Sequence, residues 1–451
     1  MTFLNGKKIK KSMVWRNWAG NINCRPKRVY TPNSEEELTN IIQNAAISGV
    51  RVKVVGAGHS CSEIAVSDES YFISMEHLNH LVAIDKISGL VTVQAGIKLA
   101  DLNEVLDEHN LALPNLGAID EQSIAGAINT GTHGTGMCFG TIASFVVELQ
   151  LLLANGNIIT CSSTENSDIF HAARVGLGSL GVITRVTLAC VPAFNLNIEE
   201  CPTKLKDTID NLDQYLKSER FGFWWFPHTD MVRLWIAQHT DISSRRKNNR
   251  FLDWIRDVLI LNRGHEVALL IAAGYPSLIP YINRFIQKCF FNRPKSRVVR
   301  SMDGFRHTIL VRQVVLEYAI PLSSTAEALY GMKNLIKDHC YKVHHPIDVR
   351  FGGSDDSWLS PAQGRDTCYI GIIMYRPFGR EIPYENYFKD VDNLFARLGG
   401  RPHWGKVHYR SAKDLRSMYP YWNEFLTLRQ LLDPEGMFLN DYLERVFGIG
   451  G

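Results

Sequence analysis

Two glycine-rich segments near the N-terminus constrain this chain more than any other feature. Gly56-Ala57-Gly58 directly follows a strand-like alternation at 50–55, and a second loop at 123–136 combines four glycines with hydroxyl side chains. The exposed backbone N–H groups of such turns can form a concave site for phosphate oxygens, and small residues let a ligand approach closely. Two such loops suit one pyrophosphate held between two lobes.

The histidine that follows the first loop raises the question of which cofactor the loop serves. Gly56 and Gly58 satisfy only the first half of the Gly-x-Gly-x-x-Gly pattern, because Cys61 stands where a third glycine would pack a helix against the strand. A predicted helix also precedes the strand, which is the wrong order for that fold. The pattern therefore disfavours a nicotinamide-type Rossmann site and leaves the role of His59 open.

Short alternating elements around these loops predict an α+β fold. Ser34 and Glu37 form a capping-box pattern before an apolar face at 38–45, which predicts a helix that Gly49 ends. The alternation at 50–55 predicts the strand that leads into the first loop. Further short strands are expected at 71–74, 82–85 and 91–95, and a second amphipathic helix near 99–106.

The second half of the chain differs in character from the first. Residues 146–153 and 158–161, joined by a short turn, predict a hairpin, and another strand is expected to end near 191. From about 193 onward the chain is richer in aromatic and charged residues and lacks glycine loops. We therefore expect a domain boundary near residue 192, and we expect the aromatic run at 223–226 to lie in a core.

Composition excludes several classes of protein. The chain has 451 residues, of which 45% are hydrophobic and 21% charged, which is enough apolar material for a large core and two or three domains. The formal net charge is +3 and the Lys and Arg residues are spread along the chain, so nucleic acid is not an expected partner. Nine scattered cysteines without a Cys-x-x-Cys pair, and no signal peptide, favour a reduced intracellular setting.

One apolar stretch leaves the question of a membrane open. Residues 267–282 are almost wholly apolar, contain Pro276 and Pro280, and are followed by five basic residues up to Arg297. The stretch has 16 residues, fewer than the ~20 of a spanning helix. It is either a buried helix pair with a solvated basic end or part of a patch within 251–297 that lies on a membrane surface. The second interpretation places the protein at a membrane such as the endoplasmic reticulum, and the first places it in the cytoplasm.

The glycine loops, together with other motifs, resemble a known group of flavoproteins. Val55–Ser60, Thr130–Gly134 and Gly178–Ile183, in that order and spacing, are similar to the FAD-binding domain of the vanillyl-alcohol-oxidase, or PCMH-type, flavoproteins. Within that group the chain resembles the aldonolactone oxidases over nearly its whole length, and most of all their animal-type L-gulono-1,4-lactone oxidase branch. The motifs that carry this resemblance are 17–19, 113–119, 225–228, 355–361, 373–377, 400–406 and 437–440.

The resemblance implies a two-lobed FAD-binding domain over 1–192 and a cap domain over 193–451. The cap has an antiparallel sheet flanked by helices, and its C-terminal segment returns to the flavin domain. In covalent members of the family the histidine of the first loop carries the flavin through its 8α-methyl group, so the resemblance assigns this role to His59, and it implies that His133 hydrogen-bonds beside the flavin. The other positions that it assigns to FAD are Val55, Gly56, Ala57, Gly58, Ser60, Gly117, Ser123, Gly126, Thr130, Gly131, Thr132, Gly134, Gly181, Val182 and Ile183.

The cap domain supplies candidate catalytic residues. Flavin oxidation of a secondary alcohol needs hydride delivery, a route for the hydroxyl proton, and positive charge beside the reduced flavin. Asp348 and Arg350 fall on one face of a predicted strand and resemble the family's Glu-x-Arg pair. The resemblance implies that Asp348 orients or deprotonates the substrate hydroxyl and that Arg350 stabilises the alkoxide and the flavin. The aspartate is one methylene shorter than the usual glutamate, so its reach requires a shifted strand or a bridging water.

Two further residues of the cap are implied to act at the flavin. Lys406 matches the family lysine beside flavin N1 and C2=O, where an ammonium group favours the reduced anion. His403 is the neighbouring candidate for orienting the substrate or the flavin. Gly117 stands where plant dehydrogenases of the family have an alanine whose methyl group obstructs oxygen, so we expect O2 as the electron acceptor.

The resemblance implies oxidation of the C2 hydroxyl of an aldono-1,4-lactone, with L-gulono-1,4-lactone as the first candidate. The products would be hydrogen peroxide and a precursor that tautomerises to L-ascorbate. One alternative is a dehydrogenase that passes electrons to a quinone or a cytochrome. Another is an oxidase of D-arabinono-lactone, L-galactono-lactone or an alditol. A third is a flavin-free scaffold or membrane-recruited binding protein with a decayed active site, which is favoured only by the aspartate at position 348 in place of the usual glutamate.

Two histidine pairs do not predict a metal site. His77-x-x-His80 and His344-His345 each lack a third ligand at a useful spacing. Hydrolysis by a serine nucleophile is not expected either, because the chain contains no Gly-x-Ser-x-Gly elbow.

Overall fold

A parallel three-stranded sheet leads into the first glycine loop. The computed structural model describes residues 14–243, 263–304 and 310–449. In spatial order the sheet consists of β3 (Arg28–Tyr30), β5 (Tyr71–Ser74) and β4 (Val52–Val55), with α1 (Glu35–Ile47) between β3 and β4 in the sequence. The predicted helix is confirmed: the Ser34 hydroxyl accepts a hydrogen bond from the Glu37 N–H, and Gly49 follows the helix with a φ of +59°.

An antiparallel five-stranded sheet forms the rest of this first unit. Its spatial order is β10 (Ile158–Ser162), β9 (Val146–Leu152), β11 (Val182–Ala189), β7 (Leu90–Gln94) and β6 (Leu81–Asp85). The predicted hairpin is confirmed, because β9 and β10 pair antiparallel with Leu152 opposite Ile158. Three helices contribute to the same apolar core: α2 (Leu99–Glu108), α3 (Ile124–Asn129) and α4 (Ser167–Ala173). Short strands complete the unit: β1 (Trp15–Arg16), β2 (Asn23–Cys24), β8 (Leu111–Ala112) and β12 (Val191–Pro192).

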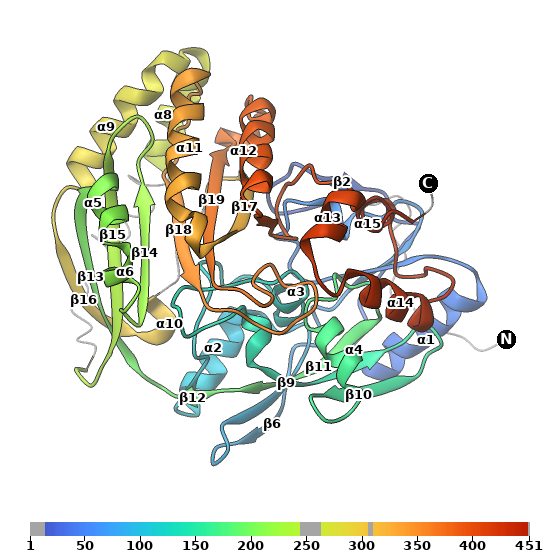
Figure 1. Cartoon of the computed structure of the whole chain (residues 1–451). Coiled ribbons are helices and arrows are strands. Elements are labelled where there is room, and N and C mark those ends of the chain that lie inside the picture. The colour runs from blue at the N-terminus through green and yellow to red at the C-terminus, as the bar shows by residue number, and fades with distance from the viewer. Residues whose placement is uncertain (1–13, 244–262, 305–309, 450–451) are drawn as a thin grey trace.

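A single eight-stranded antiparallel sheet dominates the second unit, which stands beside the first in Figure 1. Its spatial order is β16 (Lys295–Arg300), β13 (Asn195–Lys204), β15 (Met231–Thr240), β14 (Arg220–Trp225), β18 (Ile347–Gly352), β19 (Thr367–Tyr375), β17 (Gln313–Pro321) and β20 (Arg401–Pro402). The helices that pack on it or lie at its ends are α5 (Leu205–Asp210), α6 (Leu212–Tyr215), α10 (Ser301–Gly304), α11 (Thr325–Asp338) and α12 (Glu385–Arg397).

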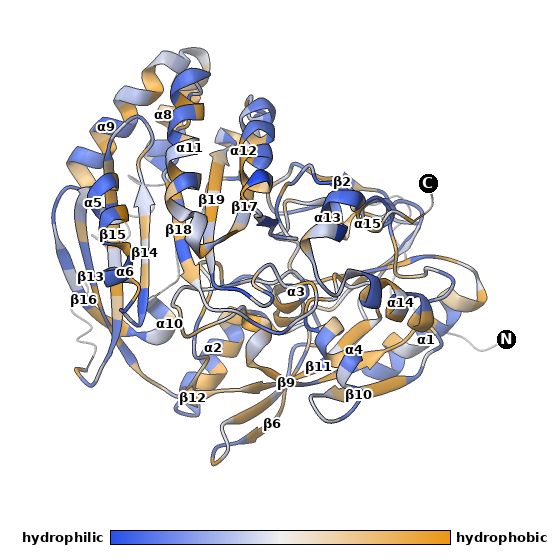
Figure 2. Cartoon of the chain, viewed as in Figure 1, coloured by the Kyte–Doolittle hydropathy of each residue, from blue (hydrophilic) through white to orange (hydrophobic). Residues whose placement is uncertain are grey.

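The two faces of this sheet carry different residues, because successive side chains of a strand point to opposite sides. Leu316, Val349 and Ile370 belong to the apolar core that the sheet shares with α11 and α12. Figure 2 shows β19 largely hydrophobic and the outer sides of these helices more hydrophilic. The run at 223–226 contributes buried aromatic rings, as expected. The opposite face carries charged residues, described below.

The C-terminal segment returns from the cap sheet to the first unit. It contains α13 (Ala412–Met418), α14 (Trp422–Leu432) and α15 (Asp441–Phe447), which lie over the same half of the molecule as α1 in Figure 1. The Met437 carbonyl accepts a hydrogen bond from the Val52 N–H at 2.8 Å, beside the first glycine loop. Asn440 Nδ2 donates to the carbonyl oxygens of Ile64 and Val66 at 3.3 and 2.5 Å.

The apolar stretch at 267–282 is not a buried helix pair. It forms α8 (His265–Gly274) and the start of α9 (Ile279–Phe290), and α9 exposes Tyr281 and Phe285 by 66% and 64%. The same helix buries two amide side chains, Asn283 and Gln287. The interpretation as a buried pair is therefore wrong, while residues 251–262 of the predicted patch lie outside the described residues. Among the described helices, none combines the length and apolarity needed to cross a bilayer.

Candidate active site

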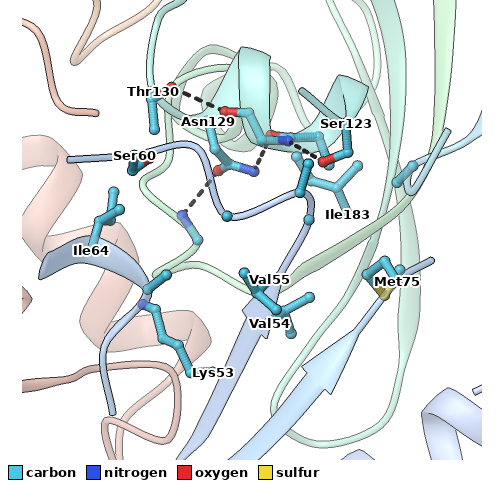
Figure 3. Close-up of a pocket in the computed structure, with 18 of the residues that line it drawn as sticks. Lys53, Val54, Val55, Ser60, Ile64, Met75, Ser123, Asn129, Thr130 and Ile183 are labelled. Carbon is cyan, nitrogen blue, oxygen red and sulfur yellow. Dashed lines mark hydrogen bonds between the residues drawn. The ribbon is translucent and has the colours of Figure 1, made fainter. Parts of the chain in front are cut away.

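A cavity with an empty volume of about 920 Å³ lies between the glycine loops of the first unit (Figure 3). Much of the wall is backbone, because glycine and alanine occupy many of the lining positions. The predicted residues that line it are Val55, Gly56, Ala57, Gly58, His59, Ser60, Ser123, Gly126, Thr130, Gly181, Val182 and Ile183.

The two predicted loops meet at Gly56. A methyl group on Gly56 would lie only 1.9 Å from Ser123 Oγ, so the close approach of the loops requires glycine. Ser123 Oγ in turn accepts a hydrogen bond from the Gly126 N–H at 3.3 Å. The third loop is attached in a similar way, since Asn129 Oδ1 accepts a hydrogen bond from the Gly178 N–H at 2.9 Å (Figure 3). Three segments far apart in the sequence therefore surround one cavity.

Part of the second loop turns away from the cavity toward the rest of the protein. A methyl group on Gly131 would meet Pro361 Cδ at 3.0 Å, and one on Gly134 would meet Asn115 Oδ1 at 2.5 Å. These glycines therefore allow two protein segments to approach closely. The predicted positions that do not line the cavity are Gly117, Gly131, Thr132, His133 and Gly134.

His59 stands at the end of the first loop with its ring stacked on Trp18, at a centroid distance of 5.6 Å. Its Nδ1 atom is buried and has no hydrogen-bond partner within the described residues. Burial lowers the pKa of His59; Glu121 opposes this shift and the charge of Lys406 adds to it. The imidazole is therefore neutral near pH 7 and keeps a nitrogen lone pair.

The segment 403–406 packs against the loop that carries this histidine. The Gly405 carbonyl accepts a hydrogen bond from the Cys61 N–H at 2.8 Å. His403 Nδ1 accepts a hydrogen bond from the Gly405 N–H at 3.0 Å, and burial lowers the pKa of His403 to about 3. His403 is thus neutral, and Lys406 follows it at the same end of the cavity.

Asp348 and Arg350 form an ion pair on β18, as their spacing predicts. Arg350 Nε lies 2.9 Å from Asp348 Oδ2, and the two side chains are only 8% and 22% exposed, respectively. The other carboxylate oxygen of Asp348, Oδ1, is buried and has no hydrogen-bond partner in the part of the chain that the structure describes. The pair is therefore not a surface ion pair, and Oδ1 can accept a hydrogen bond from a ligand.

Gly117 packs against the second glycine loop. A methyl group at this position would lie 3.1 Å from Thr132 Cγ2 and 3.4 Å from the His133 carbonyl oxygen. Any side chain here would narrow the space between the two segments.

Comparison with known proteins decides the family. Residues 186–446 match the family model of D-arabinono-1,4-lactone oxidase, and residues 26–162 match that of an FAD-binding domain. The chain belongs to the D-arabinono-1,4-lactone oxidase family. L-gulonolactone oxidase of Bos taurus is 43% identical to it over 97% of this chain and 99% of its own length. L-gulono-1,4-lactone dehydrogenase of Mycobacterium tuberculosis is 38% identical over 97% of this chain and 100% of its own.

Solved structures show the fold of this D-arabinono-1,4-lactone oxidase family member. A solvent-stable cholesterol oxidase superposes with a TM-score of 0.78 at 16% identity and covers 97% of both chains. The crystal structure of cholesterol oxidase from B. sterolicum gives 0.77 at 15% identity, over 98% of this chain and 97% of its own. The predicted PCMH-type flavoprotein fold and the predicted family are both confirmed.

Lys53 is a cavity residue of this family member that sequence reasoning missed. Its side chain on β4 is 3% exposed, and Nζ donates a hydrogen bond to the Phe438 carbonyl at 3.4 Å. Burial lowers the pKa of Lys53 to about 7. The alternation of strand residues suggests that the Lys53 side chain faces solvent, but the returning C-terminal segment covers that side of β4.

Glu317 is the second missed residue, although one acid within the apolar strand at 313–321 was a visible anomaly. His133 Nε2 lies 2.5 Å from its Oε1. Burial alone would raise the pKa of Glu317, but the charge and hydrogen bond of His133, and the charge of Lys406, hold that pKa well below its usual range.

The atoms of His133, Glu317 and His403 are close enough together to bind one metal ion. His403 Nδ1, however, already accepts the Gly405 N–H, which leaves its other nitrogen protonated in the neutral ring. The positive charge of Lys406 beside Glu317 also opposes a second cation. This cluster is better described as a hydrogen-bonded ion-pair network.

Proposed function

We propose that this protein is an FAD-dependent oxidase of an aldono-1,4-lactone, with L-gulono-1,4-lactone as the first substrate. The observation that carries the proposal is the segment 403–406, which hydrogen-bonds to both sides of the site: the Gly405 carbonyl accepts from the Cys61 N–H of the flavin loop at 2.8 Å, and the His403 N–H donates to the Glu317 carbonyl of the cap sheet at 3.0 Å. One site thus combines a cofactor loop with ionised cap residues. The name of the Bos taurus relative, 43% identical, supports the choice of lactone.

The residues of the cavity suit FAD. The loops offer backbone N–H groups and small side chains, which we assign to the phosphates of the cofactor. FAD, when bound, accepts the hydride that leaves the substrate carbon. Lys406 supplies positive charge where the reduced cofactor is anionic, and the neutral ring of His403 orients the substrate beside it.

Asp348 and Arg350 act on the substrate hydroxyl in this proposal. The unpaired Oδ1 of Asp348 accepts a hydrogen bond from the C2 hydroxyl and either orients it or takes its proton. Arg350 holds the carboxylate and stabilises negative charge on the substrate oxygen. The CH–OH group becomes C=O, two electrons and two protons pass to O2 to give hydrogen peroxide, and the oxidised lactone tautomerises to L-ascorbate.

A panel of lactones tests the proposed substrate. Purified enzyme is incubated in air with L-gulono-, L-galactono- and D-arabinono-1,4-lactone and with an alditol, and hydrogen peroxide is measured. We expect the highest kcat/KM with L-gulono-1,4-lactone. Turnover of the alditol alone, or no peroxide with any lactone, would contradict the proposal.

We assign covalent attachment of the flavin to His59. The buried and unpaired Nδ1, on a ring whose pKa burial lowers, has the lone pair needed to bond to the flavin 8α carbon. After acid precipitation the yellow colour should stay with the wild-type polypeptide and be released from His59→Ala. The exposed His80 gives a matched control, since His80→Ala should keep the colour bound. Release of flavin from the wild type would refute the assignment.

O2 is the proposed acceptor because Gly117 stands where the family's plant dehydrogenases have an alanine, and a methyl group here would press on the second loop, 3.1 Å from Thr132 Cγ2. A dehydrogenase is the second candidate, because the Mycobacterium tuberculosis relative carries that name at 38% identity. Oxygen consumption and dye reduction, measured with the same lactone, separate the two. A dye rate far above the oxygen rate would favour the dehydrogenase.

We propose that the two units are functional domains that meet near residue 192. In this division 1–192 binds the flavin and 193–451 binds the substrate. The return of the C-terminal segment supports the arrangement, because Tyr442 and Phe447 belong to the core of the first unit.

We also propose that the outer side of α8 and α9 binds a membrane surface. The helix α9 buries a polar residue and exposes aromatic residues, the reverse of an ordinary surface helix. Asn283 is buried and donates to the carbonyls of Pro227 and Val343 at 3.2 and 2.9 Å. Tyr281 and Phe285 face solvent. The exposed basic residue Arg284 lies between these two aromatic rings in the sequence. An apolar face with basic neighbours suits the boundary between headgroups and acyl chains.

Co-sedimentation with liposomes tests this surface. The wild type should sediment with vesicles that contain anionic lipid, and Tyr281→Glu with Phe285→Glu should reduce the membrane partition coefficient about tenfold, a loss of ~1.4 kcal/mol. Ile47→Glu changes an equally exposed apolar residue on α1 and should have no effect. Equal binding of both variants would exclude α9 as the contact.

A further inference from the structure

Two carboxylates share one row of the cap sheet. Glu317 on β17 and Asp348 on β18 both lie opposite Gly371 of β19, the strand between them. Side chains in register across neighbouring strands project from the same face. Both acids therefore stand on the face away from α11 and α12, on either side of a residue without a side chain.

Gly371 leaves a gap that both acids border. A methyl group on Gly371 would lie 3.6 Å from Glu317 Oε2 and 3.8 Å from Asp348 Cβ. The two acidic side chains keep 15% and 22% of their surface exposed, respectively, although they lie deep between the two units. The Glu317 side chain thus borders the same gap as the Asp348–Arg350 pair.

The hydrogen bonds of His133 determine its charge. Nδ1 lies 2.9 Å from the Gly134 carbonyl oxygen, and Nε2 lies 2.5 Å from Glu317 Oε1. Both partners are acceptors when Glu317 is ionised, so the ring satisfies both only when each nitrogen carries a proton. Stacking on Tyr369, at a centroid distance of 3.4 Å, fixes the plane of the ring. His133 is thus an imidazolium held by Glu317.

The second oxygen of Glu317 remains available. Within the described residues, Oε1 takes the bond from His133 and no protein group donates to Oε2, which faces the gap at Gly371. The charges of His133 and Lys406 lie beside the carboxylate and keep it ionised, and Asp348 and Arg350 face the gap from β18. An ionised carboxylate only accepts hydrogen bonds, so its natural ligand here is a hydroxyl.

We infer that Glu317 is a second substrate-contacting acid, which holds His133 as an imidazolium through Oε1 and accepts a hydrogen bond through Oε2 from a lactone hydroxyl other than the one oxidised. The inference rests on the proposed function for the identity of the substrate. It gives the site two carboxylates with separate tasks: Asp348 acts on the reacting hydroxyl, and Glu317 selects substrates that carry a further hydroxyl at the right place.

Monodeoxy lactones test the contact. The wild type and Glu317→Gln are compared with L-gulono-1,4-lactone and with analogues that each lack one hydroxyl away from C2. One analogue should lose roughly tenfold or more in kcat/KM with the wild type, as expected for loss of a hydrogen bond to a charged group, and most of that discrimination should disappear in Glu317→Gln. Asp355→Asn is the control: it removes another acid between the units, one bonded to Thr141 and Ser360 at 2.7 Å, and should leave the discrimination unchanged.

Spectra of the holoenzyme labelled with ¹⁵N-histidine test the imidazolium without turnover. One ring should have both nitrogens protonated in the wild type and in Asp355→Asn, and this signal should be lost in Glu317→Gln. If that variant does not retain flavin, the wild-type signal should still shift on addition of lactone and not on addition of the discriminated analogue.

The outcomes separate the inference from the proposed function. A wild type that oxidises lactones, with unchanged discrimination in Glu317→Gln or without a doubly protonated ring, overturns the inference alone. A wild type that oxidises no lactone overturns the proposed function. In that case the labelled spectrum still decides the state of His133, and perturbation of the flavin absorption by each analogue decides the contact.

Discussion

The two sides of the site are built in different ways. The flavin cavity is lined largely by consecutive residues of a few loops, in which the backbone and the absence of side chains make the wall. The charged face of the cap sheet takes single side chains from β17, β18 and the segment after β20, which are widely separated in the sequence. The cavity depends on small residues at local positions, whereas the charged face depends on which distant residues become neighbours.

The two sides also treat buried charge differently. Lys53 in the cavity wall has one long hydrogen bond to a carbonyl, and burial lowers its pKa to about 7. The Glu317 side chain is 15% exposed and also largely buried, yet cationic neighbours keep it ionised. Desolvation always disfavours the charged form, and nearby opposite charge or hydrogen bonds to the charged form reverse this preference. The cap face is therefore the place where ionised groups can act on a substrate.

The largest effect should come from the charged face. If that face performs the chemistry and the cavity only holds the flavin, Asp348→Asn should lower kcat roughly 10²–10⁴-fold and leave flavin content unchanged. Lactone turnover and the flavin-to-protein absorbance ratio measure the two quantities. Asp230→Asn changes an exposed acid elsewhere on the cap and serves as the control. Loss of flavin in Asp348→Asn would break the separation between the two sides.

The converse is expected in the cavity. Gly56→Ala introduces a methyl group 1.9 Å from Ser123 Oγ and so forces the two loops apart. Overpacking of this kind costs about 1–3 kcal/mol, so flavin content should fall about tenfold while turnover per bound flavin stays near that of the wild type. Gly274→Ala, at a helix end with nothing within 4 Å of the added methyl, is the matched control. A large fall in turnover per flavin would show that the cavity wall takes part in the chemistry.

Gly117→Ala should have a smaller and more selective effect. Its methyl group would lie 3.1 Å from Thr132 Cγ2 and narrow the space that we assign to oxygen. Reoxidation by O2 should slow about tenfold, equivalent to ~1.4 kcal/mol, while reduction by lactone and transfer to a dye change little. Stopped-flow measurement of both half-reactions checks this expectation. Equal slowing of the reduction by lactone and the reoxidation by O2 would instead indicate that the flavin is displaced.

The smallest effect lies outside the site, where the cap buries histidines without counter-charges. Burial lowers the pKa of His265 and of His345 to about 4, beside the ring of Tyr375. Between pH 4 and about 6.5 the unfolded chain binds more protons than the folded one, so stability should fall with falling pH over this window, by at most roughly 3 kcal/mol per histidine.

Thermal melts of the wild type and His345→Gln between pH 4 and 8 check this expectation. The variant should lose less stability on acidification than the wild type. Parallel curves for the two proteins would show that these histidines are not protonated on unfolding.

Much of the flavin side could be predicted from the sequence. Glycine spacing, the helix that Ser34 caps, and the hairpin of β9 and β10 are local patterns, and the structure confirms them. The prediction was less complete for the second loop, in which Gly131 and Gly134 follow the same glycine pattern but allow contacts with Pro361 and Asn115. A glycine indicates that something approaches closely, but it does not say whether this is a ligand or another protein segment.

The sequence by itself determined the family, the class of cofactor and the adjacency of Asp348 and Arg350, because these depend on residues close together in the chain. Only the tertiary structure decided that Glu317 faces His133 across 184 positions, that the C-terminal segment buries Lys53, and that α9 turns its aromatic rings outward. The physical reason is that charge and burial depend on neighbours brought together by strand register and by the return of distant segments. No local pattern of residues encodes those neighbours.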